Sequence, residues 1–222
     1  MFLLNNIQHS YFDKTVLNLS CWEGAQGSHC LVVGASGSGK TTLLHIMAGL
    51  ITPQRGNVMI AHQKLGQLHS SALDRFRGQN IGIVFKKQHL INALTVFDNL
   101  VLAQYLANLS QNKKRVAAVL AQLNLTAQQQ VYPPALSQAQ AQRVALARAV
   151  INRPKIILCD EPTASLDDVH CQQVLDLLEN QAQECNATLV IGTHDARVKQ
   201  RLKSPQYPFI KGEVLQLNII NN

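Results

Sequence analysis

The sequence lacks any long apolar run. Its longest runs, such as Ile156–Cys159 and Leu189–Ile191, are far shorter than the roughly 20 apolar residues that a helix needs to cross a bilayer. The first residues, Met-Phe-Leu-Leu-Asn-Asn, have neither a basic start nor an extended apolar region. We therefore expect neither a membrane-spanning segment nor a secretory signal peptide.

Cysteines are few and show no pairing pattern. There are 5 of them, an odd number, and no C-x-x-C spacing occurs among Cys21, Cys30, Cys159, Cys171 and Cys185. This usage is typical of reduced thiols in a cytosolic protein and argues against a disulfide framework or a cysteine-rich metal site. Asn-x-Ser/Thr triplets, such as the one at Asn186, therefore carry no meaning for glycosylation.

Acidic residues are scarce compared with basic ones. The chain has 13 Asp and Glu against 20 Lys and Arg, which gives a net charge of +7 and a pI near 9.3. Such a balance suits either nucleic acid or an anionic membrane surface. The basic clusters are short (Lys86–Lys87 and Lys113–Arg115) and no nucleic-acid-binding motif accompanies them. We expect no nucleic-acid partner, and the charge favours the inner face of a membrane.

The 222 residues are enough for a substantial core, and 46% of them are hydrophobic, as in an ordinary globular protein. Short β-like segments alternate with helical ones, except that between residues 94 and 152 three successive segments all have helical apolar spacing. This order predicts an α/β core with an inserted helical region. The expected strands are Leu3–His9, Val16–Leu19, Cys30–Val33, Gly56–Ala61, Ile81–Phe85, Ile156–Cys159 and Thr188–Gly192, with a hairpin at Pro208–Leu217. The expected helices are Lys40–Ala48, Phe97–Leu106, Lys113–Leu123, Gln138–Ile151, Val169–Cys185 and Arg197–Leu202.

A glycine-rich turn lies at residues 34–41, between an expected apolar strand and an expected helix. It matches G-x-x-x-x-G-K-[ST], the phosphate loop of P-loop nucleotide hydrolases. Glycines let backbone N–H groups wrap a polyphosphate, and the helix directs its partially positive N-terminus at the same anion. A flexible Gly/Ser loop is the alternative, and the flanking strand and helix argue against it. The residues expected to bind nucleotide here are Gly34, Ala35, Ser36, Gly37, Ser38, Gly39, Lys40, Thr41 and Thr42.

Within that loop, Lys40 should reach the β- and γ-phosphates of ATP, and the Thr41 hydroxyl should ligate Mg²⁺. An acidic pair lies elsewhere in the sequence, because the apolar strand expected at residues 156–159 is followed by Asp160 and Glu161. An aspartate at this position can bind Mg²⁺, and a neighbouring glutamate can polarise the attacking water. Two acids that merely cap the next helix are the alternative interpretation.

Four motifs occur in one order along the chain: Gly34–Thr41, Leu136–Gln140, Asp160–Asp167 and Gly192–Asp195. Together they resemble the nucleotide-binding subunit of an ATP-binding cassette (ABC) transporter over essentially its whole length. Three further segments are Gly34–Leu44, Ile81–Phe85 with His89 and Leu90, and Gln142–Ala149. They are most similar to the branch of the family that holds the lipoprotein-release, macrolide-export, cell-division and haem-export ATPases.

The resemblance implies a fold and its division. The fold is a P-loop (RecA-like) α/β core with an N-terminal antiparallel β subdomain and an inserted α-helical subdomain. Residues 1–222 would form one ATP-binding domain, with 1–87 and 154–222 as the catalytic core and β subdomain. Residues 88–153 would form the helical subdomain that carries the signature motif.

The resemblance also assigns roles. Glu161 matches the general base, and His194 matches the switch histidine that contacts the γ-phosphate. Tyr11 matches the aromatic residue that stacks on adenine, with Phe12 as the fallback and a core aromatic as the alternative. Ser165–Asp167 matches the loop that contacts a second cassette.

The signature helix would begin at Ser137, which is well suited to cap it. Its N-terminus would face the γ-phosphate of ATP held by a second copy, so that Ser137, Ala139 and Gln140 would complete that copy's site. ATP binding would close the dimer, and hydrolysis would release it. A homodimer is expected, and a heterodimer is open.

Two departures from the family pattern stand out. The signature Leu-Ser-Gly-Gly-Gln has Gln138 and Ala139 in place of both glycines. The added methyl of Ala139 would press on phosphate or ribose, at small cost if the backbone there is helical. Where the family has a Mg²⁺-ligating glutamine, this chain has Lys86, and an ammonium group cannot ligate a metal. Either Lys86 contacts the γ-phosphate or Gln88 takes over from the same face of an extended strand; otherwise hydrolysis or coupling is weakened.

The resemblance implies a transport motor that hydrolyses ATP and is bound to separate membrane-spanning subunits on the cytoplasmic face of the inner membrane. Residues 90–106 would transmit the motion to the membrane partner. The alternative is a regulatory module that binds ATP and dimerises but hydrolyses it poorly. Export, or extraction from the membrane, is favoured over uptake, and the substrate stays open because the membrane partner selects it.

Overall fold

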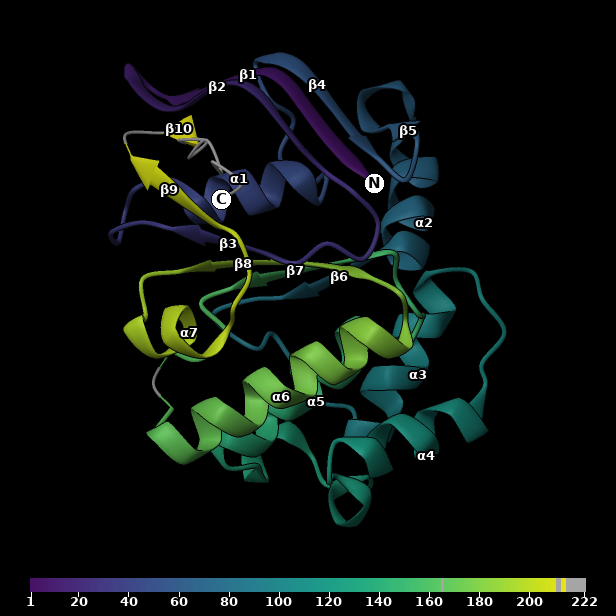
Figure 1. The fold of residues 1–222 in the computed structure, drawn as a ribbon. Helices are drawn as coiled ribbons and strands as arrows, with labels where there is room; N and C mark the ends of the chain where they lie inside the picture. The colour runs from purple at the N-terminus through teal and green to yellow at the C-terminus, as the bar shows by residue number, and fades with distance from the viewer. Residues whose placement is uncertain (165, 211–212, 215–222) are drawn as a thin grey trace.

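The computed structural model describes residues 1–164, 166–210 and 213–214. In this part of the chain, two sheets and a set of helices form a layered α/β fold (Figure 1). The strands are β1 Phe2–Tyr11, β2 Lys14–Gly24, β3 Cys30–Val33, β4 Arg55–Ile60, β5 Gln63–Lys64, β6 Ile81–Val84, β7 Ile156–Asp160, β8 Thr188–Thr193, β9 Gln206–Ile210 and β10 Glu213–Val214. The helices are α1 Lys40–Met47, α2 Ser70–Asn80, α3 Val96–Leu106, α4 Lys113–Gln122, α5 Gln138–Val150, α6 Asp168–Glu184 and α7 Ala196–Arg201, with single 3₁₀ turns at Leu65–Gln67, Thr126–Gln128 and Pro133–Ala135.

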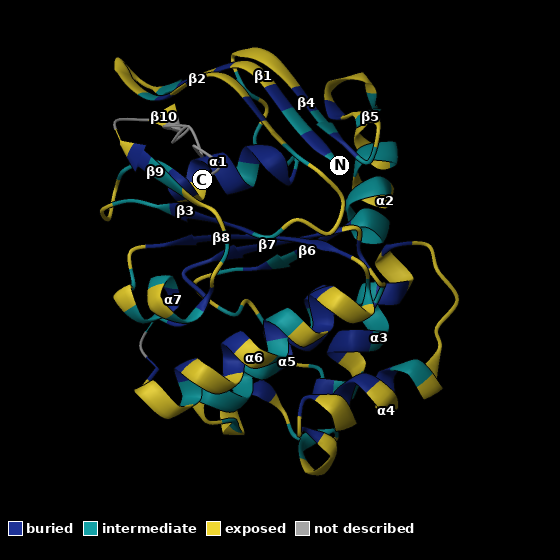
Figure 2. Ribbon diagram, in the orientation of Figure 1, coloured by how far each residue is buried: buried dark blue, intermediate teal, exposed yellow. Residues whose placement is uncertain are grey.

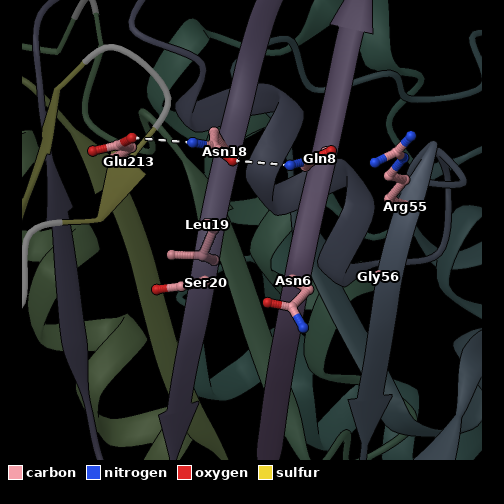
Figure 3. Close-up of a pocket in the computed structure, with 8 residues that line it drawn as sticks. All are labelled: Asn6, Gln8, Asn18, Leu19, Ser20, Arg55, Gly56 and Glu213. Atoms are coloured by element: carbon pink, nitrogen blue, oxygen red, sulfur yellow. Dashed lines mark hydrogen bonds between the residues drawn. The ribbon is translucent and has the colours of Figure 1, made fainter.

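The first sheet is antiparallel, in the order β2-β1-β4-β5. Its inner face is apolar, and its outer face carries polar side chains that run across the strands (Figure 3). There, Gln8 donates to Asn18 at 3.3 Å, and Asn18 donates to Glu213 of β10 at 3.3 Å. This alternation of apolar and polar residues is what a sheet with one solvated face requires.

The second sheet is mostly parallel, in the order β10-β9-β3-β8-β7-β6, with β10 antiparallel to β9. Its central strands β7 and β8 are buried along their whole length (Figure 2), because both faces are covered. Leu31 packs in one core cluster and Val32 in the other, which is the period-two alternation of a strand. The carboxyl ends of β3, β7 and β8 therefore lead into one region, where the motifs lie.

Helix α1 lies between the two sheets, and helices α5 and α6 pack on the opposite face of the parallel sheet, with α3 and α4 packed against α5 (Figure 1). The side chains of Leu43, Ile46 and Met47 are completely or almost completely buried between the sheets. Every helix in the described ranges is too short or too polar to cross a lipid bilayer.

The expected elements are present, with three differences, of which the smallest is that the two-residue strand β5 was not predicted. Helix α2 was not predicted, because none of its residues is fully buried and its sequence has no strong apolar stripe. Strands β1 and β2 are longer than predicted, and their pairing shifts register between His9 and Ser10. For the hairpin expected at 208–217, the paired residues of β9 and β10 confirm the antiparallel arrangement. Its turn at 211–212 and its residues 215–217 lie outside the described residues.

Candidate active site

The loop between β3 and α1 needs its glycines for two separate reasons. Gly39 has φ of 104°, and a Cβ there would lie 2.9 Å from the carbonyl oxygen of Val16. A Cβ on Gly34 would lie 2.5 Å from the carbonyl oxygen of Phe209. Gly39 precedes α1 without providing a side-chain cap, so the first N–H groups of the helix point into the loop. Such a helix start binds anions.

Lys40 lies inside the loop that precedes it. Its Nζ donates to the carbonyl oxygens of Gly34 at 2.8 Å and Ala35 at 2.9 Å, and it lies 3.5 Å from Oε1 of Glu161. The side chain is only 5% exposed. The ammonium group is therefore held at the centre of the loop, where a polyphosphate would be wrapped.

Thr41 and Asp160 meet at the start of α1. The Thr41 hydroxyl donates to Oδ2 of Asp160 at 2.8 Å, while Oδ1 of Asp160 is buried and has no hydrogen-bond partner in the described part of the chain. Burial raises the pKa of Asp160, as expected for a carboxylate that is removed from water. A hydroxyl beside an unpartnered buried carboxylate oxygen fits Mg²⁺, which usually takes one or two protein oxygens together with substrate phosphates. Within the described residues, no three His, Cys, Asp or Glu side chains gather as a protein-only metal site.

Glu161 is held by the end of strand β8. Its Oε1 lies 2.6 Å from Nδ1 of His194, and its Oε2 accepts from the Thr193 hydroxyl at 3.1 Å and from the His194 N–H at 3.3 Å. Glu161 itself has φ of 48°, an uncommon backbone conformation that is frequent at functional sites. The expected base and the expected switch histidine are thus in direct contact. The role of Thr193 was not predicted, since a threonine before a histidine carries no signal of its own.

A polar network ties the loop after Glu161 to the residues after His194. Asp195 accepts from the Thr163 hydroxyl at 2.9 Å and is paired with Arg197. These bonds to Arg197 lower the pKa of Asp195 to about 2. Arg197 also donates to the carbonyl oxygen of Leu166 at 3.0 Å. Of the predicted contact loop 165–167, residue Ser165 lies outside the described residues.

A cavity of about 290 Å³ opens over the loop. Tyr11, 43% exposed, lines it, whereas the fallback Phe12 is fully exposed and does not. Of the two candidate aromatic residues, only Tyr11 lies at this cavity, and its role against adenine stays a prediction. The lining residues are Tyr11, Val16, Ser36, Gly37, Gly39, Lys40, Thr41, Thr42, Lys86 and Glu161.

Lys86 and Gln88 have separate environments. Lys86 lines the cavity. Gln88 donates to Oε1 of Gln142 at 2.9 Å, and Gln142 donates to the carbonyl oxygen of Pro162 at 2.8 Å. The expectation that Gln88 shares a face of an extended strand with Lys86 is wrong, because β6 ends at Val84.

Ser137 caps α5, as predicted. Its hydroxyl accepts from the Gln140 N–H, and the Gln140 side chain accepts in return from the Ser137 N–H, which forms a capping box. Gln138 and Ala139 are the first two residues of the helix, so the alanine has helical backbone angles and bears little conformational cost. Ser137, Ala139 and Gln140 do not line the cavity of their own chain.

This combination of a phosphate loop, a strand-end Asp-Glu pair and a histidine bonded to the glutamate defines a P-loop nucleotide hydrolase of the cassette type. The chain matches the ABC transporter family over residues 17–164, and it belongs to that family. It is an ATP-binding, ATP-hydrolysing cassette, and cassettes of this family act with membrane subunits and dimerise.

Two curated relatives are similar to the chain in sequence, and a solved structure is similar to it in fold. The chain is 36% identical over 179 residues to the lipoprotein-releasing system ATP-binding protein LolD of Shewanella denitrificans, covering 80% of this chain and 77% of that protein. It is 37% identical to the methionine import ATP-binding protein MetN of Histophilus somni, covering 91% of this chain and 59% of that protein. Among solved structures, the ATP-binding cassette MJ0796, a dimer bound to ADP and Pi, superposes with a TM-score of 0.88 at 32% identity, with 96% of each chain covered.

Proposed function

We propose that the chain is the motor of a membrane transporter and that two cassettes close around Mg-ATP bound at the loop between β3 and α1. The main support for this site is that Lys40, Thr41, Glu161 and Tyr11 line one cavity. In addition, a buried oxygen of Asp160 has no hydrogen-bond partner within the described residues. Tyr11 would stack on the adenine, and residues 34–42 would wrap the phosphates. Thr41 and Asp160 would hold Mg²⁺, which when bound neutralises charge on the phosphates.

In the hydrolytic step, a water oxygen forms a bond to the γ-phosphorus, and the bond from that phosphorus to the bridging oxygen breaks. Glu161 accepts the proton of the water as general base. His194, which lies 2.6 Å from Oε1 of Glu161, would contact the γ-phosphate. Oε1 of Glu161 also lies 3.5 Å from Nζ of Lys40, so the proposed base lies beside both the histidine and the loop lysine.

The second cassette would supply the start of α5. The N-terminus of this helix, with Ser137, Ala139 and Gln140, would contact the γ-phosphate held by the other copy. Residues 88–153 would act as the helical subdomain, and residues 1–87 and 154–222 as the core. Support for pairing comes from the dimeric solved relative, which covers 96% of this chain.

Steady-state hydrolysis tests the motor function. The unsubstituted chain should hydrolyse Mg-ATP, and Glu161→Gln should lower kcat by about 10²–10⁴-fold, the usual contribution of a general base, while ATP binding is retained. Equal rates for the two proteins, under conditions in which both bind ATP, would contradict the proposal and favour the poorly hydrolysing module. The relatives are named as ATP-binding proteins of transport systems and lend no support to that module.

A groove of about 610 Å³ between α2, β6, α3 and α5 supports a contact with the membrane subunit. Leu50, Phe85 and Leu106 line it, and Leu50 and Leu106 are 42% and 67% exposed, so that apolar surface is gathered in the groove and is not scattered singly. A subunit bound there would hold the chain peripherally on the cytoplasmic face of the inner membrane. Export or extraction from the membrane stays our proposal for direction, and relatives named for lipoprotein release and for methionine import both occur.

The groove is tested by sedimentation with membranes from the native cell. We expect Leu106→Glu to leave the chain in the supernatant, because a charge in an apolar contact is costly. Tyr132→Glu is the matched control, since Tyr132 is also exposed but does not line the groove. If both variants sediment as the unsubstituted chain does, the contact lies elsewhere.

A further inference from the structure

We infer that Lys86 is a nucleotide-binding residue of this chain and that its ammonium group contacts the terminal phosphate of ATP. The inference rests on the proposed nucleotide site and assigns one more residue to it. Lys86 follows β6 by two positions and lines the same cavity as Lys40, Thr41 and Glu161. It is the second lysine of that cavity.

The two lysines of the cavity differ in how their charge is used. Lys40 is buried, donates to two loop carbonyl oxygens and lies 3.5 Å from Glu161. Lys86 is exposed, and within the described ranges it makes no hydrogen bond or ion pair. A lysine of this kind retains its hydration and side-chain freedom until an anion arrives. The anion that the cavity is built to receive is a polyphosphate.

The neighbouring glutamine does not compete for this place. The Gln88 side-chain amide is bonded to Gln142, and its backbone carbonyl oxygen accepts from Arg148 at 2.7 Å. Gln142 in turn donates to the carbonyl oxygen of Pro162. To reach the cavity, Gln88 would have to give up its bond to the buried Gln142, which would leave polar groups unpaired.

A lysine at position 86 changes how much of the phosphate charge is neutralised by the protein and how much by Mg²⁺. An ammonium group carries no lone pair, so position 86 offers Mg²⁺ no ligand and instead adds one positive charge beside the phosphates. This arrangement makes ATP binding less dependent on Mg²⁺ than it would be with an amide at the same position. It also makes Lys86 selective for a nucleotide that has a γ-phosphate.

The experiment measures ATP and ADP affinity by displacement of a fluorescent ATP analogue, with Mg²⁺ or with EDTA. All proteins carry Glu161→Gln so that ATP is not hydrolysed. We expect Lys86→Met to weaken ATP binding about tenfold, the loss of one charge-assisted hydrogen bond, and ADP binding less than about twofold. Lys87→Met, at an exposed lysine that does not line the cavity, should change neither.

The variant Lys86→Gln tests the metal balance. The ratio of ATP affinity in Mg²⁺ to that in EDTA should rise severalfold, because an amide oxygen can ligate the ion and the competing charge is gone. Equal losses for ATP and ADP in Lys86→Met, or no loss, would overturn the inference, as would an unchanged ratio in Lys86→Gln. Lys40→Met distinguishes an error about Lys86 from an error about the site. If Lys40→Met weakens the binding of both nucleotides while Lys86→Met weakens the binding of neither, the nucleotide site is correct and the role of Lys86 is wrong. If Lys40→Met has no effect on either affinity, both the site and the role of Lys86 are wrong.

Discussion

Two helix starts in this protein are assigned to phosphate, and they are built in opposite ways. Helix α1 begins after Gly39, which has a left-handed backbone and offers no side-chain cap. Helix α5 begins after Ser137, where Ser137 and Gln140 satisfy each other's N–H groups in a capping box. The first start leaves its donors free for a ligand, and the second has already satisfied two of them from its own chain.

The difference explains which sequence departures each start tolerates. At the open start, the glycine is required by its dihedral angle and by the nearby Val16 carbonyl oxygen. At the capped start, the two glycines of the family signature are replaced by Gln138 and Ala139, both of which lie within the helix. Helical angles suit alanine better than glycine. The open start is therefore a preorganised anion site, and the capped start is a stable helix end that must be brought to its ligand.

The largest expected effect is at the open start. Gly39→Ala forces a Cβ against the Val16 carbonyl oxygen and an alanine into a left-handed backbone. We expect a loss of about 2–3 kcal/mol of unfolding free energy and of nearly all ATPase activity, measured by urea denaturation and phosphate release. Gly37→Ala is the control, because its φ is also positive but its Cβ would meet nothing. If both variants lose the same stability, the close approach at Gly39 is unimportant.

A charged cap at a third helix start provides the next test. Asp195 caps α7 and has its pKa lowered to about 2 by Arg197. A depressed folded-state pKa stabilises the fold fully above the unfolded-state value of about 4, and this stabilisation is lost as pH falls toward 2. Asp195→Asn should therefore cost about 1–2 kcal/mol at pH 7, allowing for the partly exposed Arg197. The cost should shrink steadily below pH 4, and a cost that is independent of pH would rule out the ion pair as its source.

Loss of the cap at the start of α5 should lower the free energy of unfolding by a smaller amount. Ser137→Ala removes one hydrogen bond of the capping box and should lower the free energy of unfolding by about 1 kcal/mol. Ser137→Asn, which can cap as well, is the matched control and should be close to neutral for stability. An equal loss in both variants would mean that the cap contributes nothing and that another contact of Ser137 is responsible.

The smallest effect is expected at Ala139. Ala139→Gly restores the family residue at a helical position and should cost about 0.5–1 kcal/mol of stability, read from thermal or urea unfolding. If the methyl presses on nucleotide in the dimer, the ATPase rate rises at the same time. A gain in stability would contradict the helical assignment of this residue.

The sequence was most informative where the chemistry is local. The phosphate loop, the Asp160-Glu161 pair and the cap at Ser137 are short patterns with a mechanism, and each lies in the expected element. Contacts between distant residues were not readable: nothing in the sequence pairs Thr193 with Glu161 or Gln88 with Gln142, since these contacts depend on how loops at different strand ends meet. Helix α2 was not predicted because it has no fully buried residue, and the apolar periodicity on which helix prediction relies is therefore weak.

We propose that ATP in the loop after β3 joins two cassettes through the start of α5. Light scattering of the Glu161→Gln chain, with and without Mg-ATP, measures this pairing. The mass should double with Mg-ATP, and the doubling should be lost in a chain that also carries Lys40→Met. A chain that remains single when Mg-ATP saturates it would show that the nucleotide does not join two cassettes.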